Sequence, residues 1–145
     1  MKKILYTIFM VTLLSGCATQ SSIFPLENQA PSTSNTGNVR ISMLKNSGNT
    51  MIVHFMFDKG SRNYWHYHPN VEQTLLVLDG EGFYQEEGKE KRHIRKGDVI
   101  VTPPNVCHWN GATPNTKIYC MTITEHSEDN HVVQLRAVTD EEYNK

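Results

Sequence analysis

From residue 39 onward, short runs of hydrophobic and β-branched residues alternate with short polar turns. The turns are rich in Gly, Pro, Asn and Asp, which favour tight reversals of the chain. They lie at 47–49, 58–60, 79–82, 87–89, 96–98, 103–105 and 113–115. Strand-length runs separated by turns at this frequency predict an all-β sandwich or barrel.

The runs between the turns define the expected strands. These cover 39–44, 50–57, 63–68, 73–79, 82–86, 91–95, 98–102, 106–110 and 117–125, with an edge strand around 131–137. Only the end of the chain has a helical signal, because Thr139 and Glu142 have capping-box spacing. We therefore expect Thr139 to be the N-cap of a short final helical turn.

Two histidines, His66 and His68, lie two positions apart in one expected strand. Side chains alternate between the faces of a strand, so the two imidazoles should face the same way, together with Arg62 and Tyr64. Two imidazoles at this spacing can bind one metal ion. His108, on a later strand, is the natural third imidazole.

These histidines lie in two motifs that resemble those of the cupin family of small β-barrels. The first motif is matched by Gly60, His66, His68 and Gly80, and the second by Gly97, Pro103 and His108. Asn105 replaces a glycine of the second motif and also tolerates a positive φ. The resemblance covers about residues 39–143 and implies a double-stranded β-helix, or jelly-roll barrel, with a metal inside.

The resemblance also implies a fourth metal ligand. Six residues before Gly80 stands Gln73, whereas Glu72 fits an alternative spacing that the family allows. The distance to Gly80 favours Gln73. We expect one divalent ion, Zn, Mn, Fe or Ni, bound by His66, His68, His108 and Gln73.

More narrowly, the chain resembles the small cupins associated with carboxymuconolactone decarboxylases. The shared stretches lie at 65–69, 73–75, 80–82, 108–109, 111–114 and 138–143. A glutamine at the fourth-ligand position is usual in that subgroup. The chain departs from it at Asn110 and Cys120, where many members have histidine.

The expected ligands are all uncharged, which bears on what the site binds. Three neutral imidazoles and an amide leave the double charge of the ion uncompensated, so the site should favour an anion. Arg62 and Tyr64 are then the expected substrate contacts. Two functions fit: a metal-dependent enzyme of the isomerase, lyase or dioxygenase type acting on a small anionic or sugar-acid-like compound, or a non-catalytic module that binds a metal or small anion at the cell envelope.

The N-terminus carries a second signal. Two lysines precede the apolar run 4–14, which is too short to span a bilayer, and residues 14–17 read Leu-Ser-Gly-Cys. This resembles a bacterial lipoprotein signal, which predicts removal of residues 1–16, lipidation of Cys17, a flexible tether over 17–38 and a cupin domain over 39–145. We then expect a lipid-anchored protein of the bacterial envelope, on the outer membrane facing the periplasm if the source has two membranes.

The remaining partners follow from charge and from the aromatic and sulfur residues. The net charge is −1 and no basic stripe is present to hold nucleic acid, so membrane contact is expected through the lipid alone. Trp109 suits either the core or a homodimer contact.

The cysteines leave three alternatives open. In a hairpin over 106–125, Cys107 would face Cys120 and could form a disulfide, whereas a one-residue shift would place Cys120 beside His108. Two free thiols are the third alternative.

Overall fold

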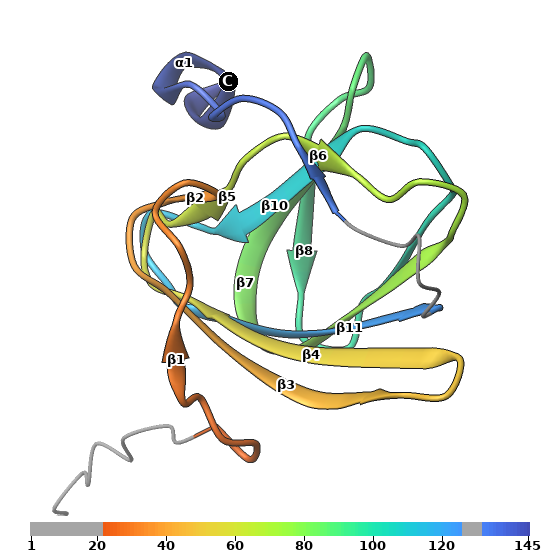
Figure 1. Cartoon of the computed structure of the whole chain (residues 1–145). Coiled ribbons are helices and arrows are strands. Elements are labelled where there is room, and N and C mark those ends of the chain that lie inside the picture. The colour runs from red at the N-terminus through yellow and green to blue at the C-terminus, as the bar shows by residue number, and fades with distance from the viewer. Residues whose placement is uncertain (1–21, 126–131) are drawn as a thin grey trace, which may run out of the picture.

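The computed structural model describes residues 22–125 and 132–145. Its twelve strands curl into a half-open barrel of two facing antiparallel sheets (Figure 1). The strands are β1 (Asn28–Gln29), β2 (Asn35–Thr36), β3 (Val39–Ser47), β4 (Thr50–Phe57), β5 (Arg62–Asn63), β6 (His66–Tyr67), β7 (Gln73–Glu86), β8 (Arg92–Arg95), β9 (Val99–Thr102), β10 (His108–Ala112), β11 (Ile118–Glu125) and β12 (Val133–Gln134). This confirms the predicted all-β, jelly-roll class.

The first sheet contains β1, β3, β4, β11, β9 and the start of β7, and the second contains β2, β5, β6, β8, β10, β12 and the end of β7. Strand β7 therefore belongs to both sheets, although the sequence predicted two separate strands, 73–79 and 82–86. It changes sheets at Gly80, which has φ +78° and where an added Cβ would lie only 1.9 Å from the Lys117 carbonyl oxygen. Only glycine fits this corner.

The hydrophobic core occupies part of the barrel interior. Alternate residues of β7 and β11 face inward, among them Leu75, Val77, Ile118 and Cys120, and pack with residues from the other strands. Phe57 on β4 borders both this core and a cavity in the rest of the interior. The barrel thus has a packed part and a hollow part.

The expected strand 63–68 is interrupted. It appears as β5 and β6, which both pair with β10 but are separated by Tyr64 and Trp65. Between the register pairs Arg62/Gly111 and His66/His108, the β5–β6 segment has one residue more than the facing segment of β10. This one-residue excess is a β-bulge, and it changes which side chains face the interior.

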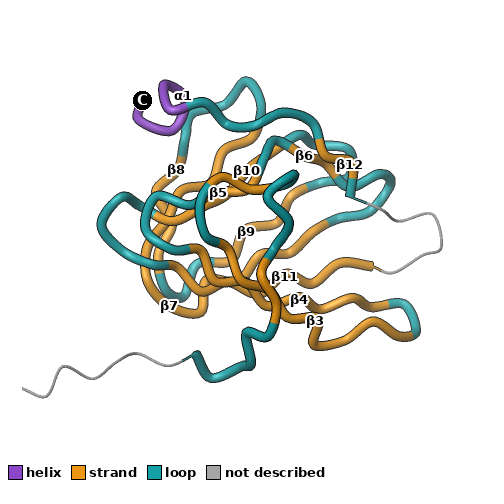
Figure 2. Tube along the Cα trace, turned by 60° about the vertical axis from the view of Figure 1, so that its left-hand side comes forward, coloured by secondary structure: helices purple, strands orange, loops and turns teal. Residues whose placement is uncertain are grey.

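A small aromatic cluster lies on the outer side of the second sheet. Trp65, Trp109, Val138 and Tyr143 are buried there under the C-terminal segment. This segment ends in the short helix α1 (Asp140–Asn144), which lies on the far side of the molecule from β3 and β4 (Figure 2). The predicted capping box is confirmed, with Thr139 as N-cap.

Part of the expected tether is ordered against the barrel, so that expectation is wrong for residues 28–36. Strand β1 pairs with β3, β2 pairs with β5, and Ala30 is buried between them. A polar composition did not reveal these backbone pairings. Cys17 and the expected signal peptide lie outside the described residues, as does the start of the expected strand 131–137, of which β12 is the described part.

The expected hairpin over 106–125 does not form either. Strand β10 pairs with β5, β6 and β7, whereas β11 pairs with β4 and β7. Cys107 and Cys120 are consequently free thiols, the third of the alternatives, with burial raising the pKa of both. Among the described helices, none is long and apolar enough to cross a membrane.

Candidate metal centre and its pocket

Three histidines converge at the wall of the barrel cavity. His66 on β6 pairs with His108 on β10, and their ring centroids lie 4.3 Å apart. His68 follows β6, with its ring centroid 5.4 Å from that of His66 and 5.6 Å from that of His108. Ligand nitrogens of the three buried rings lie within 4.8 Å of one another, so they could hold one metal ion.

Backbone carbonyls fix the orientation of two rings. Nδ1 of His66 lies 2.9 Å from the Tyr64 carbonyl oxygen, and Nδ1 of His108 lies 2.9 Å from the Val106 carbonyl oxygen. A carbonyl oxygen only accepts, so each Nδ1 must donate its proton. Each neutral ring then has its lone pair on Nε2, the atom available to a metal.

The three rings are held in the neutral form that metal binding requires. Burial lowers the pKa of His66 to about 3, assisted by repulsion from His108. Burial likewise lowers the pKa of His68 and of His108 to about 4, with repulsion from His66 and His68, respectively, as a smaller cause. At pH 7 all three imidazoles therefore offer a lone pair rather than a charge.

Gln73, at the start of β7, is the fourth residue of the cluster. Its Nε2 lies 2.7 Å from Nε2 of His68, and its Oε1 lies 3.2 Å from Nε2 of His108. Glu72 is exposed and does not line the cavity. Of the two alternatives for the fourth ligand, the structure places Gln73 among the histidines.

The contact between Gln73 and His108 tests whether this set fits a metal. His108 donates from Nδ1, so its Nε2 and the Gln73 Oε1 both present lone pairs to each other across 3.2 Å. Two ligands bound at about 2.1 Å and at right angles to each other are about 3 Å apart. A cation beside both atoms removes the repulsion, so the donor set fits a divalent ion.

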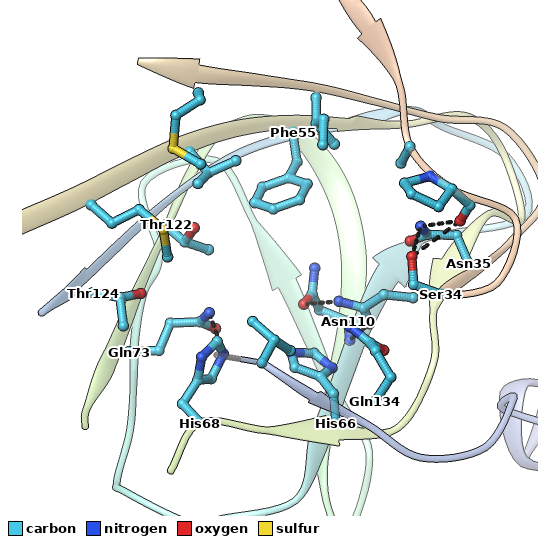
Figure 3. Close-up of a pocket in the computed structure, with 18 of the residues that line it drawn as sticks. Ser34, Asn35, Phe55, His66, His68, Gln73, Asn110, Thr122, Thr124 and Gln134 are labelled. Atoms are coloured by element: carbon cyan, nitrogen blue, oxygen red, sulfur yellow. Dashed lines mark hydrogen bonds between the residues drawn. The ribbon is translucent and has the colours of Figure 1, made fainter. Parts of the chain in front are cut away.

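His66, His68 and Gln73 form one side of a cavity of about 250 Å³ (Figure 3), and His108 lies buried behind them. The opposite wall is apolar and comes from β3 and β4, with Phe55 facing the histidines in Figure 3. Its members are Ile41, Met43, Met51, Val53, Phe55 and Phe57. Within the described residues, no Lys, Arg, Asp or Glu side chain lines the cavity.

Arg62 and Tyr64, the expected substrate contacts, do not line the cavity, because the bulge between β5 and β6 turns both away from it. Arg62 donates to the Asp140 carboxylate at 2.6 Å and to the Val138 carbonyl at 3.0 Å, and its guanidinium stacks on Tyr143. Tyr64 bonds instead to the N-terminal segment, where its backbone N–H donates to the Ser34 carbonyl.

Other residues take their place at the cavity. Asn63, beside the bulge, lines the cavity and bonds to Asn110. The segment held by Tyr64 contributes Ala30, Pro31, Ser34 and Asn35 to the wall. Strand alternation alone could have marked the inward residues of β4, but it could not show that they border a cavity. Nothing local in the sequence signals Asn63 or the N-terminal segment.

Comparison with known proteins identifies the family. The cupin domain model matches residues 53–124. Over 113 residues, the chain is 37% identical to a protein named (R)-mandelonitrile lyase from Granulicella tundricola, with 76% of this chain and 86% of that protein covered. The chain belongs to the cupin family. The paired sheets and the three-histidine cluster of this cupin agree with that assignment.

Solved structures agree. A cupin-like protein from Thermotoga maritima superposes with a TM-score of 0.81 at 39% identity, covering 86% of this cupin and 96% of the other chain. A predicted oxalate decarboxylase from the same organism superposes with a TM-score of 0.62 at 20% identity, covering 74% and 91% of the two chains. The second likeness shows the fold alone.

Proposed function

We propose that this cupin is a metal-dependent lyase that cleaves or forms the carbon–carbon bond of a small cyanohydrin-like compound. Such a substrate has a compact polar end, with a hydroxyl group and a nitrile, and an apolar body. The observation that carries the proposal is the pairing of a neutral three-histidine cluster with an apolar wall in one small cavity. The relative named mandelonitrile lyase supports it.

The cavity suits a small, mainly apolar ligand better than a sugar acid. Its volume of about 250 Å³ lies below the roughly 300–1,000 Å³ of sites for drug-sized molecules. Sugar acids would need partners for several hydroxyl groups, and the β3–β4 wall offers methionine, aliphatic and phenylalanine side chains instead. The anion that we expect is therefore an alkoxide or cyanide.

Each side of the cavity has a distinct part in this proposal. His66, His68, His108 and Gln73 would hold the ion, which, when bound, supplies a Lewis acid beside the substrate oxygen. The wall containing Phe55 binds the apolar body and excludes water from the polar end. Because the four ligands are neutral, negative charge that develops on the substrate is stabilised rather than repelled.

The second candidate is a non-catalytic module that binds a metal or small anion. It is favoured by one observation: apart from the histidines of the cluster, the described lining contains no side chain that readily accepts a proton near pH 7. Asn110, which lines the cavity next to the cluster, cannot do so.

Cleavage of racemic mandelonitrile separates the two candidates. Metal-free protein is loaded with Mn, Fe, Ni or Zn, and benzaldehyde release is followed by its ultraviolet absorption. We expect release above the uncatalysed rate with at least one metal, and loss of both metal binding and release in His66→Ala. Mandelonitrile binding without accelerated release by any metal-loaded form would favour the binding module.

We also propose that the mature protein is anchored to the membrane through lipid on Cys17. The lipoprotein-like box at 14–17 supports this proposal. We expect the wild type to fractionate with membranes and Cys17→Ser to be released into the soluble fraction. Recovery of the wild type in a periplasmic extract, free of membranes, would contradict the proposal.

A further inference from the structure

We propose that Asn110 presents a fixed hydrogen-bond donor to the cavity and thereby selects ligands that carry an acceptor beside the metal centre, and that Asn63 is the positioning residue that fixes this orientation. The inference rests on the proposed function and deepens it, since it names the group that recognises the polar end of the substrate. It concerns a pair of neutral side chains outside the metal-binding set.

The orientation of both amides follows from one backbone group. The backbone N–H of Asn110 donates to Oδ1 of Asn63 at 2.8 Å, and a backbone N–H can only donate. The atom of Asn63 facing it is therefore the oxygen, which leaves Nδ2 of Asn63 to face Asn110. That Nδ2 donates to Oδ1 of Asn110 at 3.0 Å.

As a result, the Asn110 amide must turn its nitrogen toward the cavity. Figure 3 shows the amide with its oxygen on the dashed bond and its nitrogen pointing into the open space. No described residue accepts a hydrogen bond from this Nδ2, although Asn110 is only 5% exposed. A donor that lines the cavity without a protein partner is free to bond to an acceptor on a ligand.

The position of this donor relative to the metal centre defines the ligand. Asn110 and His108 are two residues apart on β10, so they face the same side about 7 Å apart along the strand. A small ligand at the cluster can therefore place an acceptor, such as a carbonyl, alkoxide or nitrile group, within reach of Nδ2. Hydrocarbons without an acceptor leave the donor unpaired and are disfavoured.

Two substitutions replace the hydrogen-bond donor that faces the cavity by an acceptor. In Asn110→Asp, one carboxylate oxygen keeps the bond from Asn63 and the other replaces the cavity-facing donor by an acceptor. In Asn63→Asp, the new carboxylate accepts from both Asn110 nitrogens, so the Asn110 amide turns over and presents its oxygen. Asn115→Asp, in an exposed turn, makes the same change of charge away from the cavity.

The readout is the binding of benzaldehyde and of styrene to metal-loaded protein by calorimetry. The two probes have similar shapes, but only benzaldehyde carries an acceptor. We expect the wild type and Asn115→Asp to prefer benzaldehyde, and both Asn110→Asp and Asn63→Asp to lose about tenfold of that preference, the effect of one hydrogen bond. Styrene affinity and metal content should stay unchanged.

An unchanged preference in Asn110→Asp, or equal affinities of the wild type for the two probes, would overturn the inference. An equal loss of benzaldehyde and styrene binding would also overturn it, because it would indicate a change in cavity shape. If the expected preference is seen but mandelonitrile is not cleaved, the lyase proposal fails and the donor assignment stands. If cleavage occurs with the same rate and KM in both variants, the donor assignment fails alone.

Discussion

At the scale of single residues, the absence of charge distinguishes the candidate metal centre. The pKa values of the three histidines are lowered mainly by burial, and Gln73 adds an amide in contact with two of them. A glutamate at this position would cancel one of the two charges on the ion. A glutamine at this position would therefore leave a bound ion with its full charge and favour anions under the proposed function.

This choice leads to a first prediction, for Gln73→Glu. The added carboxylate should strengthen binding of a divalent metal by roughly tenfold and weaken cyanide binding by a similar factor, because it attracts the cation and reduces the net charge that holds the anion. Metal titration and cyanide titration of the metal-loaded variant measure the two effects. Gln29→Glu, at an exposed position on β1, is the control and should change neither.

Cyanide affinity that is unchanged in Gln73→Glu would remove Gln73 from direct contact with the metal. Equal shifts in Gln73→Glu and Gln29→Glu would assign the effect to the overall charge of the protein. Either result would leave the fourth position to water.

At the scale of elements, the bend in β7 connects the core to the metal centre. Gln73 lies at one end of this strand, and the residues after Gly80 pair with β10, which carries His108. The strand reaches both sheets only because a side chain is missing at the corner. Because β7 is continuous, it fixes the position of Gln73 relative to His108.

We therefore predict that Gly80→Ala destabilises the fold by about 3 kcal/mol or more, since it adds a collision with the Lys117 carbonyl to the strain of a positive φ. Gly88→Ala is a matched control, with φ +75° and open space where its new Cβ would lie. It should cost only about 1 kcal/mol. Urea unfolding of the two variants gives the difference, and equal losses of stability would show that the corner is not tightly packed.

The positions of strands were predictable because the turns between them are marked by local sequence. The direction of side chains was not predictable where it depends on pairing between strands far apart in the chain. Gly, Pro and Asn mark most strand ends in the sequence, and Thr139 with Glu142 marks the helix. The bulge near Tyr64 depends on pairing with β10, more than 40 residues away in the chain, and has no local signal. His66 and His68 were predictable as a pair because both follow the bulge, so their two-residue spacing keeps them on one face. Arg62 precedes the bulge, so the same spacing rule placed it on the wrong face.

At the scale of the whole molecule, the cavity depends on segments that are far apart in the sequence. Ala30, Pro31, Ser34 and Asn35 form part of its wall, although the composition of their segment suggested a tether, and β3 and β4 form the apolar side. A cavity of this kind cannot be inferred from strand periodicity, because inward residues look the same whether they border a core or an open space. Its apolar wall and uncharged lining emerged only from the assembled barrel.

The buried histidines also make global stability depend on pH. In the unfolded chain they take up protons below about pH 6.5, whereas in the folded chain their pKa values are about 3 to 4. The free energy of unfolding of metal-free protein should therefore fall as pH decreases from 6.5 to 5, by up to about 1.4 kcal/mol per pH unit for each histidine.

Urea unfolding at several pH values measures this dependence. His93→Gln, at an exposed site, should retain it, and His68→Gln should reduce it. A free energy of unfolding that is constant between pH 6.5 and 5 would contradict the prediction. The chosen range lies above the pKa values of ordinary carboxylates, so their protonation contributes little.

The one-residue excess between β5 and β6 has a consequence for how such barrels diverge. One extra residue in β10 between His108 and Gly111 would balance the excess, and Arg62 would then turn toward the histidines in place of Asn63. The cavity would gain a fixed positive charge without any substitution among the residues that line it. In an alignment this change would be recorded only as a single-residue insertion in a short strand. Length variation at this point is therefore a route by which related barrels can exchange an uncharged cavity lining for a positively charged one.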